Sequence, residues 1–240
     1  MGSASITLKN KPGTTSATFN YSASGFVKPA DEADHRISYH GDDKNGQEIR
    51  ERRTYSSLSY SWSFTGGRTS SSQSGEITIT GLNAGSKGWF GGTVTVTYTE
   101  TITTTTITWS TPVDKEGKKQ TDTSTSTTTN THTETASDGL NYWTRPTAFS
   151  FGVTAEGIIG LTLSAAKVRA FGKQVGQYQR WSHQSDSYSD KTYDVSSGDV
   201  ITATLYNKIA DDVGVAHVTG GLNGTIITAK LWNDLANAAS

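Results

Sequence analysis

Cysteine is absent from the 240 residues of this chain, and proline and methionine are scarce. Without cysteine there is no disulfide framework, no thiolate metal site and no thiol nucleophile. An excess of positive charge is also missing, because 21 Lys and Arg residues stand against 22 Asp and Glu residues. A chain without a basic stripe argues against nucleic acid as a partner.

Long hydrophobic runs are missing as well. No apolar stretch approaches the roughly 20 residues that a membrane helix needs, so we expect no membrane insertion. The N-terminus, MGSASITLKN, has neither the positive segment nor the apolar segment of a secretory signal. An extracellular role would then require release by lysis or within an assembled particle.

Motifs of catalysis are the third absence. The sequence contains no nucleophile elbow, no phosphate loop and no evident pair of catalytic carboxylates. The five histidines are scattered. His35 and His40 are five residues apart, so on a strand they face opposite sides and cannot share a metal. We predict no catalytic residue, no cofactor and no metal.

What the chain does contain is alternation. Ala17, Phe19 and Tyr21 occupy every second position of residues 14–24. A second strand is expected over residues 47–64, where Leu58, Tyr60, Trp62 and Phe64 alternate in the same way. Period two indicates strands with one buried face. Residues 42–46, DDKNG, separate two such segments and slightly resemble a calcium loop, but the closing Glu is missing. Asn45-Gly46 instead predicts a tight type I′ hairpin turn.

Two threonine-rich arms follow, at residues 93–111 and 121–137, with a charged turn between them. Threonine at alternate positions favours strands, and cross-strand threonine pairs could hold a long hairpin that projects beyond the first domain. The alternative is a floppy Ser/Thr linker. The parity of the apolar residues slips between Ile102 and Ile107, which predicts a bulge or a strong twist there. His132 and the scattered glutamates are expected on a solvated face.

The C-terminal segment contains an internal repeat. Residues 198–210 are GDVITATLYNKIA, and residues 224–236 are GTIITAKLWNDLA. Thr202 and Thr228 take the N-cap position of a short helix. An isoleucine before each cap and an aromatic residue four positions after it have the spacing of a hydrophobic staple. We predict two small capped helices.

A weaker third copy lies earlier in the chain. Residues 161–181 have helical periodicity from about Ala165. Ser164 takes the N-cap position there, and Val168 and Phe171 take the places of Tyr206 and Ile209. The three copies together predict a compact module.

Residues 75–99 resemble the end of a fibronectin type III or related immunoglobulin-like sandwich domain. In that family a strand leads into a Gly-Leu-x-x-Gly corner and then into an alternating strand. The residues that carry the likeness are Ile77, Ile79, Leu82, Gly85, Val94, Val96 and Tyr98. Trp89-Phe90 stands where a tyrosine is common in such folds. The absence of a cysteine pair excludes a true antibody-type domain.

Residues 141–240 resemble the end of tail-associated virion proteins from phages of Gram-positive bacteria. Those proteins carry an Arg-Pro-x-x-Phe-x-aromatic stretch, here Arg145, Pro146, Phe149 and Phe151. Units of the type Ile-Thr-Ala-x-x-aromatic-Asn follow in the family, and both clear repeats match them. The resemblance implies localisation in a virion, with other virion proteins as partners, and a role as fibre, tail decoration or receptor contact.

We therefore predict a mainly β protein with three parts. Residues 1–137 form an immunoglobulin-like β-sandwich that includes the extended hairpin at 93–137. Residues 138–152 form a hinge, and residues 153–240 form a module of short capped helices.

The expected function is that of a structural virion protein that forms a homo-oligomer. The alternatives are an adhesin that binds a host glycan or receptor, and an enzyme such as a wall hydrolase. Aromatic residues could stack on sugars or cover a partner, or they could simply pack in a core. The candidates are Trp89, Phe90, Tyr142, Trp143, Tyr178, Trp181 and Tyr188.

Overall fold

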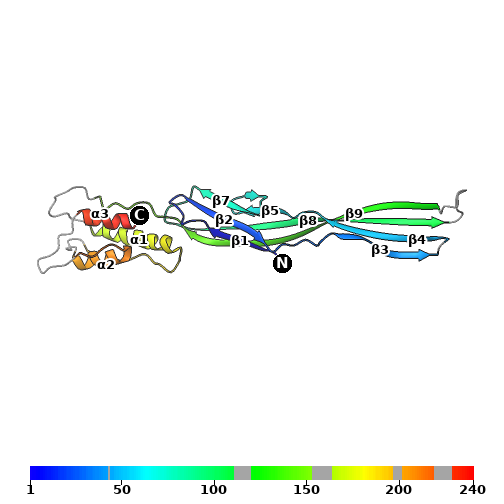
Figure 1. The fold of residues 1–240 in the computed structure, drawn as a ribbon. Helices are drawn as coiled ribbons and strands as arrows, with labels where there is room; N and C mark the ends of the chain where they lie inside the picture. Colours follow the sequence, from blue (N-terminus) through cyan, green and yellow to red (C-terminus); the bar gives the residue numbers. More distant parts are fainter. Residues whose placement is uncertain (43, 111–119, 153–163, 197–201, 219–228) are drawn as a thin grey trace. The chain divides into compact units, whose positions relative to one another are not determined.

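The computed structural model describes residues 1–42, 44–110, 120–152, 164–196, 202–218 and 229–240 (Figure 1). These residues form two compact units. The first unit comprises Met1–Ser5, Ser22–Gly75 and Gly91–Asp138, and the second comprises Ile6–Tyr21, Glu76–Phe90 and Gly139–Ser240. Both units are assembled from separate stretches of chain, whereas the predicted domains are contiguous. The predicted charged turn at residues 112–119 and the proposed N-cap Thr228 lie outside the described residues.

The described chain is mainly β, as predicted, with helices confined to its C-terminal part. The strands are β1 (Ser3–Leu8), β2 (Ser16–Ser24), β3 (Glu32–Gly41), β4 (Gly46–Tyr55), β5 (Ser59–Phe64), β6 (Arg68–Ser70), β7 (Ser74–Thr80), β8 (Lys87–Ser110) and β9 (Gln120–Trp143). The helices are α1 (Ala165–His183), α2 (Ala203–Val213) and α3 (Ala229–Ala238). One sheet has the order β1-β2-β7, and the other has the order β3-β4-β8-β5-β6, with β9 paired to β8.

Strand β8 changes partners along its length. Its residues Gly92–Thr97 pair with β5, and its residues Glu100–Trp109 pair with β4. The continuous strand predicted over residues 47–64 is therefore wrong, because the chain leaves β4 at Tyr55 and re-enters the sheet as β5 at Ser59. The bulge predicted between Ile102 and Ile107 is also absent from the pairing with β4, which runs without a register shift. Side chains in this part of β8 are half-buried on both faces, so no core imposes a parity.

The threonine-rich arms form the predicted hairpin, β8 with β9, and the linker alternative is excluded. The hydroxyl of Thr93 lies 2.7 Å from that of Ser137, and the ring of Tyr98 stacks on His132. From Thr93 to Tyr98 the residue number on β8 increases by five, and from Ser137 to His132 the number of its partner on β9 decreases by five. This is the register of an antiparallel hairpin.

In the second unit, the two sheets face each other through aromatic contacts. Phe19 of β2 stacks on Phe90 of β8 with ring centroids 4.2 Å apart, and Tyr142 of β9 packs edge-on at 5.3 Å. Ala17, Phe19 and Tyr21 are all buried, as their spacing predicted. The arrangement is that of a β-sandwich, with alternate side chains of each strand pointing inward.

The turn between β3 and β4 differs from the prediction. Gly41 pairs with Gly46, so Asn45-Gly46 is not the centre of a two-residue turn. The carboxylate of Asp42 accepts hydrogen bonds from the backbone N–H groups of Lys44 (2.7 Å) and Asn45 (2.9 Å). An Asp side chain that bonds the following backbone stabilises the turn in place of the expected glycine geometry.

The helices begin where the repeat predicts. The hydroxyl of Ser164 accepts a hydrogen bond from the N–H of Lys167 at the start of α1, and the hydroxyl of Thr202 accepts one from Leu205 at the start of α2. Both caps satisfy a backbone donor that the first turn leaves unpaired. The weaker third copy of the repeat, which forms α1, is thus a capped helix like α2.

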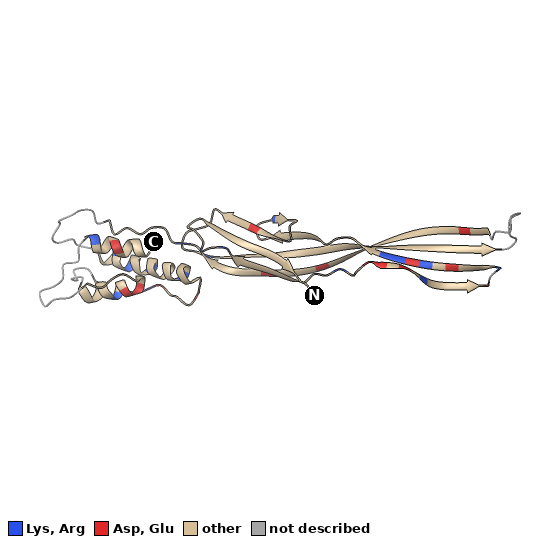
Figure 2. Cartoon of the chain, viewed as in Figure 1, with Lys and Arg blue, Asp and Glu red and all other residues tan. Residues whose placement is uncertain are grey.

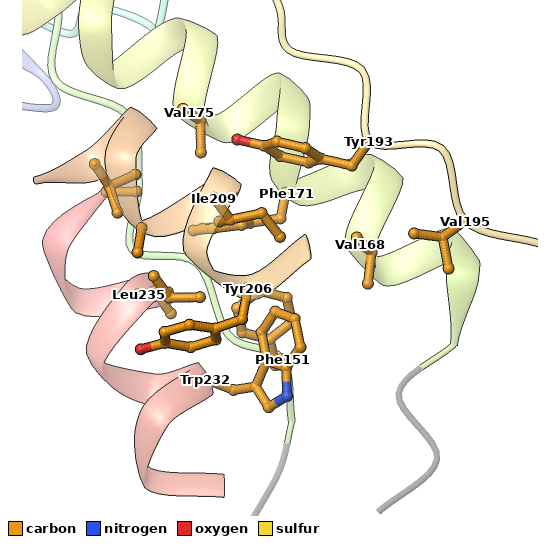
Figure 3. Close-up of a cluster of buried hydrophobic side chains, with 14 of the residues drawn as sticks. Phe151, Val168, Phe171, Val175, Tyr193, Val195, Tyr206, Ile209, Trp232 and Leu235 are labelled. Carbon is orange, nitrogen blue, oxygen red and sulfur yellow. The ribbon is translucent and has the colours of Figure 1, made fainter. Parts of the chain in front are cut away.

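Equivalent positions of the three helices form one core (Figure 3). Each helix carries a set of three buried residues, with a spacing of three between the first two and of four between the last two. They are Val168, Phe171 and Val175 on α1, Tyr206, Ile209 and Val213 on α2, and Trp232, Leu235 and Ala239 at α3. Because residues at i, i+3 and i+7 share one face of a helix, the repeat places the same face of each helix inward. Phe151 completes the core, 4.9 Å from Trp232.

Candidate functional site

All seven aromatic residues proposed as an interaction surface lie in the second unit. Two of them are core residues. Phe90 is 1% exposed and Tyr142 is 4% exposed, and both pack on Phe19. Their inclusion in an exposed surface is therefore wrong, because the same parity that buries Phe90 points its neighbour Trp89 outward. Trp89 is 56% exposed.

Trp143 and Trp181 are tied into the second unit by their indole N–H groups. Trp143 Nε1 donates to Asp186 Oδ1 at 2.8 Å, and Trp181 Nε1 donates to the carbonyl of Pro12 at 2.6 Å. The guanidinium of Arg180 lies 4.8 Å from the Trp143 ring, a cation–π contact. Both indoles therefore have structural partners within the chain.

Tyr178 and Tyr188 lie near the same end of α1. Tyr178 packs against the helical core and lies 5.7 Å from Trp181. The Tyr188 ring stacks on His183 at 4.4 Å, and its carbonyl accepts a hydrogen bond from Arg180. The structure thus brings four of the seven predicted residues together around the C-terminal half of α1, whereas Trp89 is not among their contacts.

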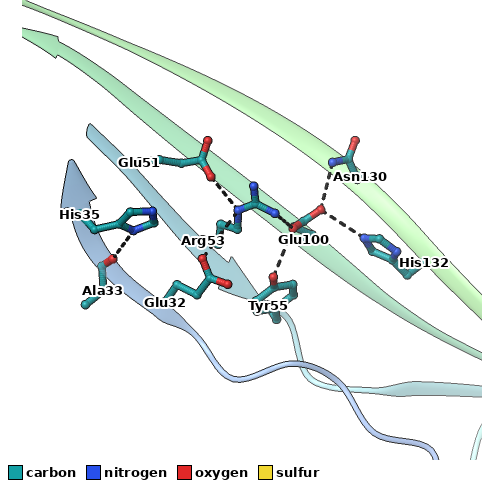
Figure 4. A network of polar contacts seen from close by, with 9 residues as sticks. All are labelled: Glu32, Ala33, His35, Glu51, Arg53, Tyr55, Glu100, Asn130 and His132. Carbon is teal, nitrogen blue, oxygen red and sulfur yellow. Dashed lines mark hydrogen bonds and ion pairs between the residues drawn. The ribbon is translucent and has the colours of Figure 1, made fainter. Parts of the chain in front are cut away.

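A second cluster, which the sequence did not predict, centres on Glu100 in the first unit (Figure 4). The β4–β8 register places Tyr55 opposite Glu100, and the hairpin brings Asn130 and His132 from β9. Glu100 Oε1 accepts hydrogen bonds from Tyr55 and Arg53, both at 3.2 Å. Glu100 Oε2 accepts hydrogen bonds from Asn130 (3.1 Å) and His132 (3.2 Å).

Glu100 is a buried and fully paired carboxylate. The residue is 7% exposed. Hydrogen bonds from Asn130 and His132 are the main causes that lower the pKa of Glu100. A hydrogen bond from Tyr55 and the positive charge of Arg53 also lower it, and together these contacts outweigh the effect of burial. A buried charge is tolerated only with such partners. Because the carboxylate is held ionised, it serves as a fixed anion that joins β4, β8 and β9, and it is poorly suited to donate a proton.

The cluster extends outward through Arg53. Its Nε lies 2.7 Å from Glu51 and 3.7 Å from Glu32, so three acidic side chains from β3, β4 and β8 surround one guanidinium. The hydrogen bond to Glu51 is the main cause of the raised pKa of Arg53. This network of ion pairs joins β3, β4 and β8 in a part of the sheet that has no apolar core.

A pocket of about 360 Å³ lies beside the Glu100 cluster, entirely within the first unit. Its lining residues are Met1, Gly25, Phe26, Val27, Leu58, Val96, Tyr98, His132, Thr133 and Glu134. Tyr98 and His132 stack with centroids 4.8 Å apart and connect the pocket to the cluster. This volume lies within the range of about 300–1,000 Å³ that is typical of small-ligand sites.

The pocket offers stacking and hydrogen bonding. The imidazole of His132 is oriented by its bond to Glu100, which fixes the face that it presents. Glu134 adds a carboxylate at the rim. Such an arrangement can hold a sugar ring or a small amphipathic molecule. Among the described residues, no group of His, Asp and Glu side chains is placed to hold a metal ion.

The assignment of His132 and the glutamates to a solvated face is wrong for Glu100. The threonine-rich sequence concealed the cluster, because the second arm carries no large apolar residue that marks an inner face near Asn130. The signal that could have revealed it is register. Pairing the arms about their common turn sets Tyr98 opposite His132 and Glu100 opposite Asn130, so acceptor and donors meet.

No helix in the described part of the chain is long and apolar enough to span a membrane. Comparison with protein families, with curated proteins and with solved structures finds no match to this chain.

Proposed function

We propose that this chain is a non-enzymatic structural protein of a virus particle, a tail, fibre or decoration component. It docks into the particle and presents an immunoglobulin-like domain. The motif resemblance at residues 145–151 and in the capped repeats suggests the particle. The observation that carries the assembly role is a section of sheet that has no core of its own.

That section, which we call the uncovered section, consists of β3, β4, residues 97–110 of β8 and residues 120–133 of β9. Within these described residues, Glu100 alone is buried. A sheet normally buries at least one face against another layer. Tyr39 and Ile37, on β3, are about half exposed, at 45% and 50%. A sheet of this kind supports a role in which neighbouring molecules supply the missing cover.

The test has two parts. Sedimentation equilibrium of the full chain should give a mass above that of one chain, and an epitope-tagged chain expressed during infection should co-purify with intact particles. A monomer that stays out of the particles would overturn the proposal. Tagged Thr69→Ala serves as a matched control that should still assemble, because it alters an exposed residue of β6 outside the uncovered section.

The pocket beside Glu100 favours a second candidate, a module that binds a glycan or a receptor on the host. Tyr98 and His132 supply stacked rings, and Glu134 supplies a hydrogen-bond acceptor. A glycan array probed with the full chain should then give signals that the Tyr98→Ala variant loses and that a variant with the exposed Thr69→Ala change on β6 keeps. A blank array, together with unchanged cell adsorption of the Tyr98→Ala variant, would exclude this function for the pocket.

A further inference from the structure

The uncovered section has two edges, and only one of them is protected. Within the described chain, β3 pairs only with β4, and β9 pairs only with β8. Each of these strands therefore has one edge without a partner strand. An unpaired edge presents a row of N–H and C=O groups that can pair with another chain.

The β3 edge carries the features that block such pairing. Its pairing with β4 has register shifts between Glu32 and His35 and between Arg36 and Ser38. Arg36 forms an ion pair across to β4, and Asp34 does the same. Bulges and charges on an edge strand are the usual means by which proteins prevent edge-to-edge association. Figure 2 shows these charged residues gathered on β3 and β4.

The β9 edge has none of these features over most of its length. Residues 120–137 contain no Lys, Arg, Pro or Gly, and their carboxylates are confined to Asp122 and Glu134. In Figure 2 the strand is almost entirely tan. Residues 120–135 are all exposed. An edge strand of 24 residues without protection is expected to pair rather than to stay free.

We propose that β9 pairs edge to edge, antiparallel, with β9 of a second copy of this chain. The occupant follows from self-complementarity, because threonine alternates along both strands and threonine pairs favourably with threonine across strands. The β8–β9 hairpin already uses such a contact, between Thr93 and Ser137. A two-fold axis lets the same surface serve both copies.

The charges select the register. Residues 123–131 are uncharged, and Thr127 is their midpoint. A two-fold axis at Thr127 sets Asp122 of one copy opposite His132 of the other. An axis at Thr128 would instead set Asp122 opposite Glu134, and carboxylates directly opposite each other are destabilising. Of these two registers, the one centred on Thr127 is favoured, because it sets a carboxylate opposite an imidazole and not opposite another carboxylate.

This inference deepens the proposed function, since it rests on the chain being an assembly component and names a second copy as the partner. Because the chain has no cysteine, single-cysteine variants give an unambiguous readout. On the axis of an antiparallel pair, equivalent Cα atoms lie about 4.5–5.5 Å apart. That separation is within the range of a disulfide, about 4.4–6.8 Å.

The experiment uses full-length variants under mild oxidation, with circular dichroism to check that each is folded. Thr127→Cys should form a covalent dimer. Thr123→Cys and Thr131→Cys should each stay uncross-linked alone but form a heterodimer when mixed, because the register sets these positions opposite each other. Thr69→Cys, an exposed threonine on β6, controls for random collision.

Cross-linking of Thr127→Cys no faster than that of Thr69→Cys would overturn the inference. If the chain sediments as an oligomer in that case, it assembles through another surface and the proposed function stands. If it sediments as a monomer and stays out of particles, both fail. As a second variant, Thr127→Lys places a charge on the edge and should shift the wild-type dimer to monomer without altering the circular dichroism spectrum.

Discussion

Replacing Trp232 by alanine should destabilise the three-helix core by about 4 kcal/mol, within the range typical of Phe and Trp truncations in cores. Trp232 is 3% exposed. Its ring lies 4.9 Å from Phe151 and 6.0 Å from Tyr206. Aromatic pairs contribute about 0.5–1.5 kcal/mol beyond the area that they bury, and alanine loses both contacts.

The loss of stability in Trp232→Ala should not be reduced by movement of neighbouring side chains into the space that the indole ring leaves. Phe151 is 1% exposed and already contacts Phe171 at 4.7 Å, so it has little freedom to move into the space. The surrounding structure relaxes only in part when a large side chain is removed, and the residual cavity adds to the loss. This argument places the expected value above the low end of the range.

Urea unfolding followed by the helical circular dichroism signal measures the change. The matched control is Lys230→Ala on the same helix, whose side chain is 82% exposed and pairs with Asp234. Its loss should stay below about 0.5 kcal/mol. A Trp232→Ala variant that loses less than about 1 kcal/mol would contradict the packing role, since truncation of a large buried side chain to alanine costs at least about 2 kcal/mol. If that variant also failed to assemble, Trp232 would be a contact residue instead.

Three further predictions concern caps, close packing and charge. Thr202→Ala should cost about 1 kcal/mol because it removes the N-cap of α2, whereas the exposed Thr204→Ala should cost little, and urea midpoints compare them. Gly172→Ala should destabilise despite a helix-propensity gain of about 1 kcal/mol, because its Cβ would lie 2.1 Å from the Lys191 carbonyl oxygen; a stabilised variant would contradict this packing. The pKa of Glu100 is lowered from 4.5, so the stability it contributes is present above pH 4.5 and lost as pH falls through the lowered value. Glu100→Gln should therefore reduce stability at neutral pH and flatten the acid limb of the pH–stability curve, and an unchanged acid limb would refute the assignment.

Local patterns predicted the parts of this fold that local physics determines. The N-caps at Ser164 and Thr202 were identified from the repeat, because capping requires only a side-chain oxygen and a nearby backbone N–H. The alternation of Ala17, Phe19 and Tyr21 likewise reports burial directly. In these cases residue type and spacing suffice.

The pairing of strands that are distant in the sequence could not be predicted from local residue patterns. Nothing in the threonine-rich arm marks the point at which β8 exchanges β5 for β4, because threonine continues at every second position from Thr93 to Thr105. The Glu100 cluster was missed for the same reason, since its donors lie 30 or more residues away on β9 or 45 or more residues away on β4. Register decides these contacts, and register follows from the packed sheet as a whole.

The bond between Trp181 and Pro12 joins residues 169 positions apart, and it has a consequence for synthesis of the chain. At about 5–20 residues per second, the first stretch of the second unit waits roughly 10–30 s on the ribosome before its partner emerges. For part of that interval Phe19, on the apolar face of β2, also lacks Phe90 and Tyr142, the aromatic residues on which it packs. Folding of the second unit is therefore expected only after Trp181 has been synthesised, and a chaperone that shields β2 should raise the yield of native protein.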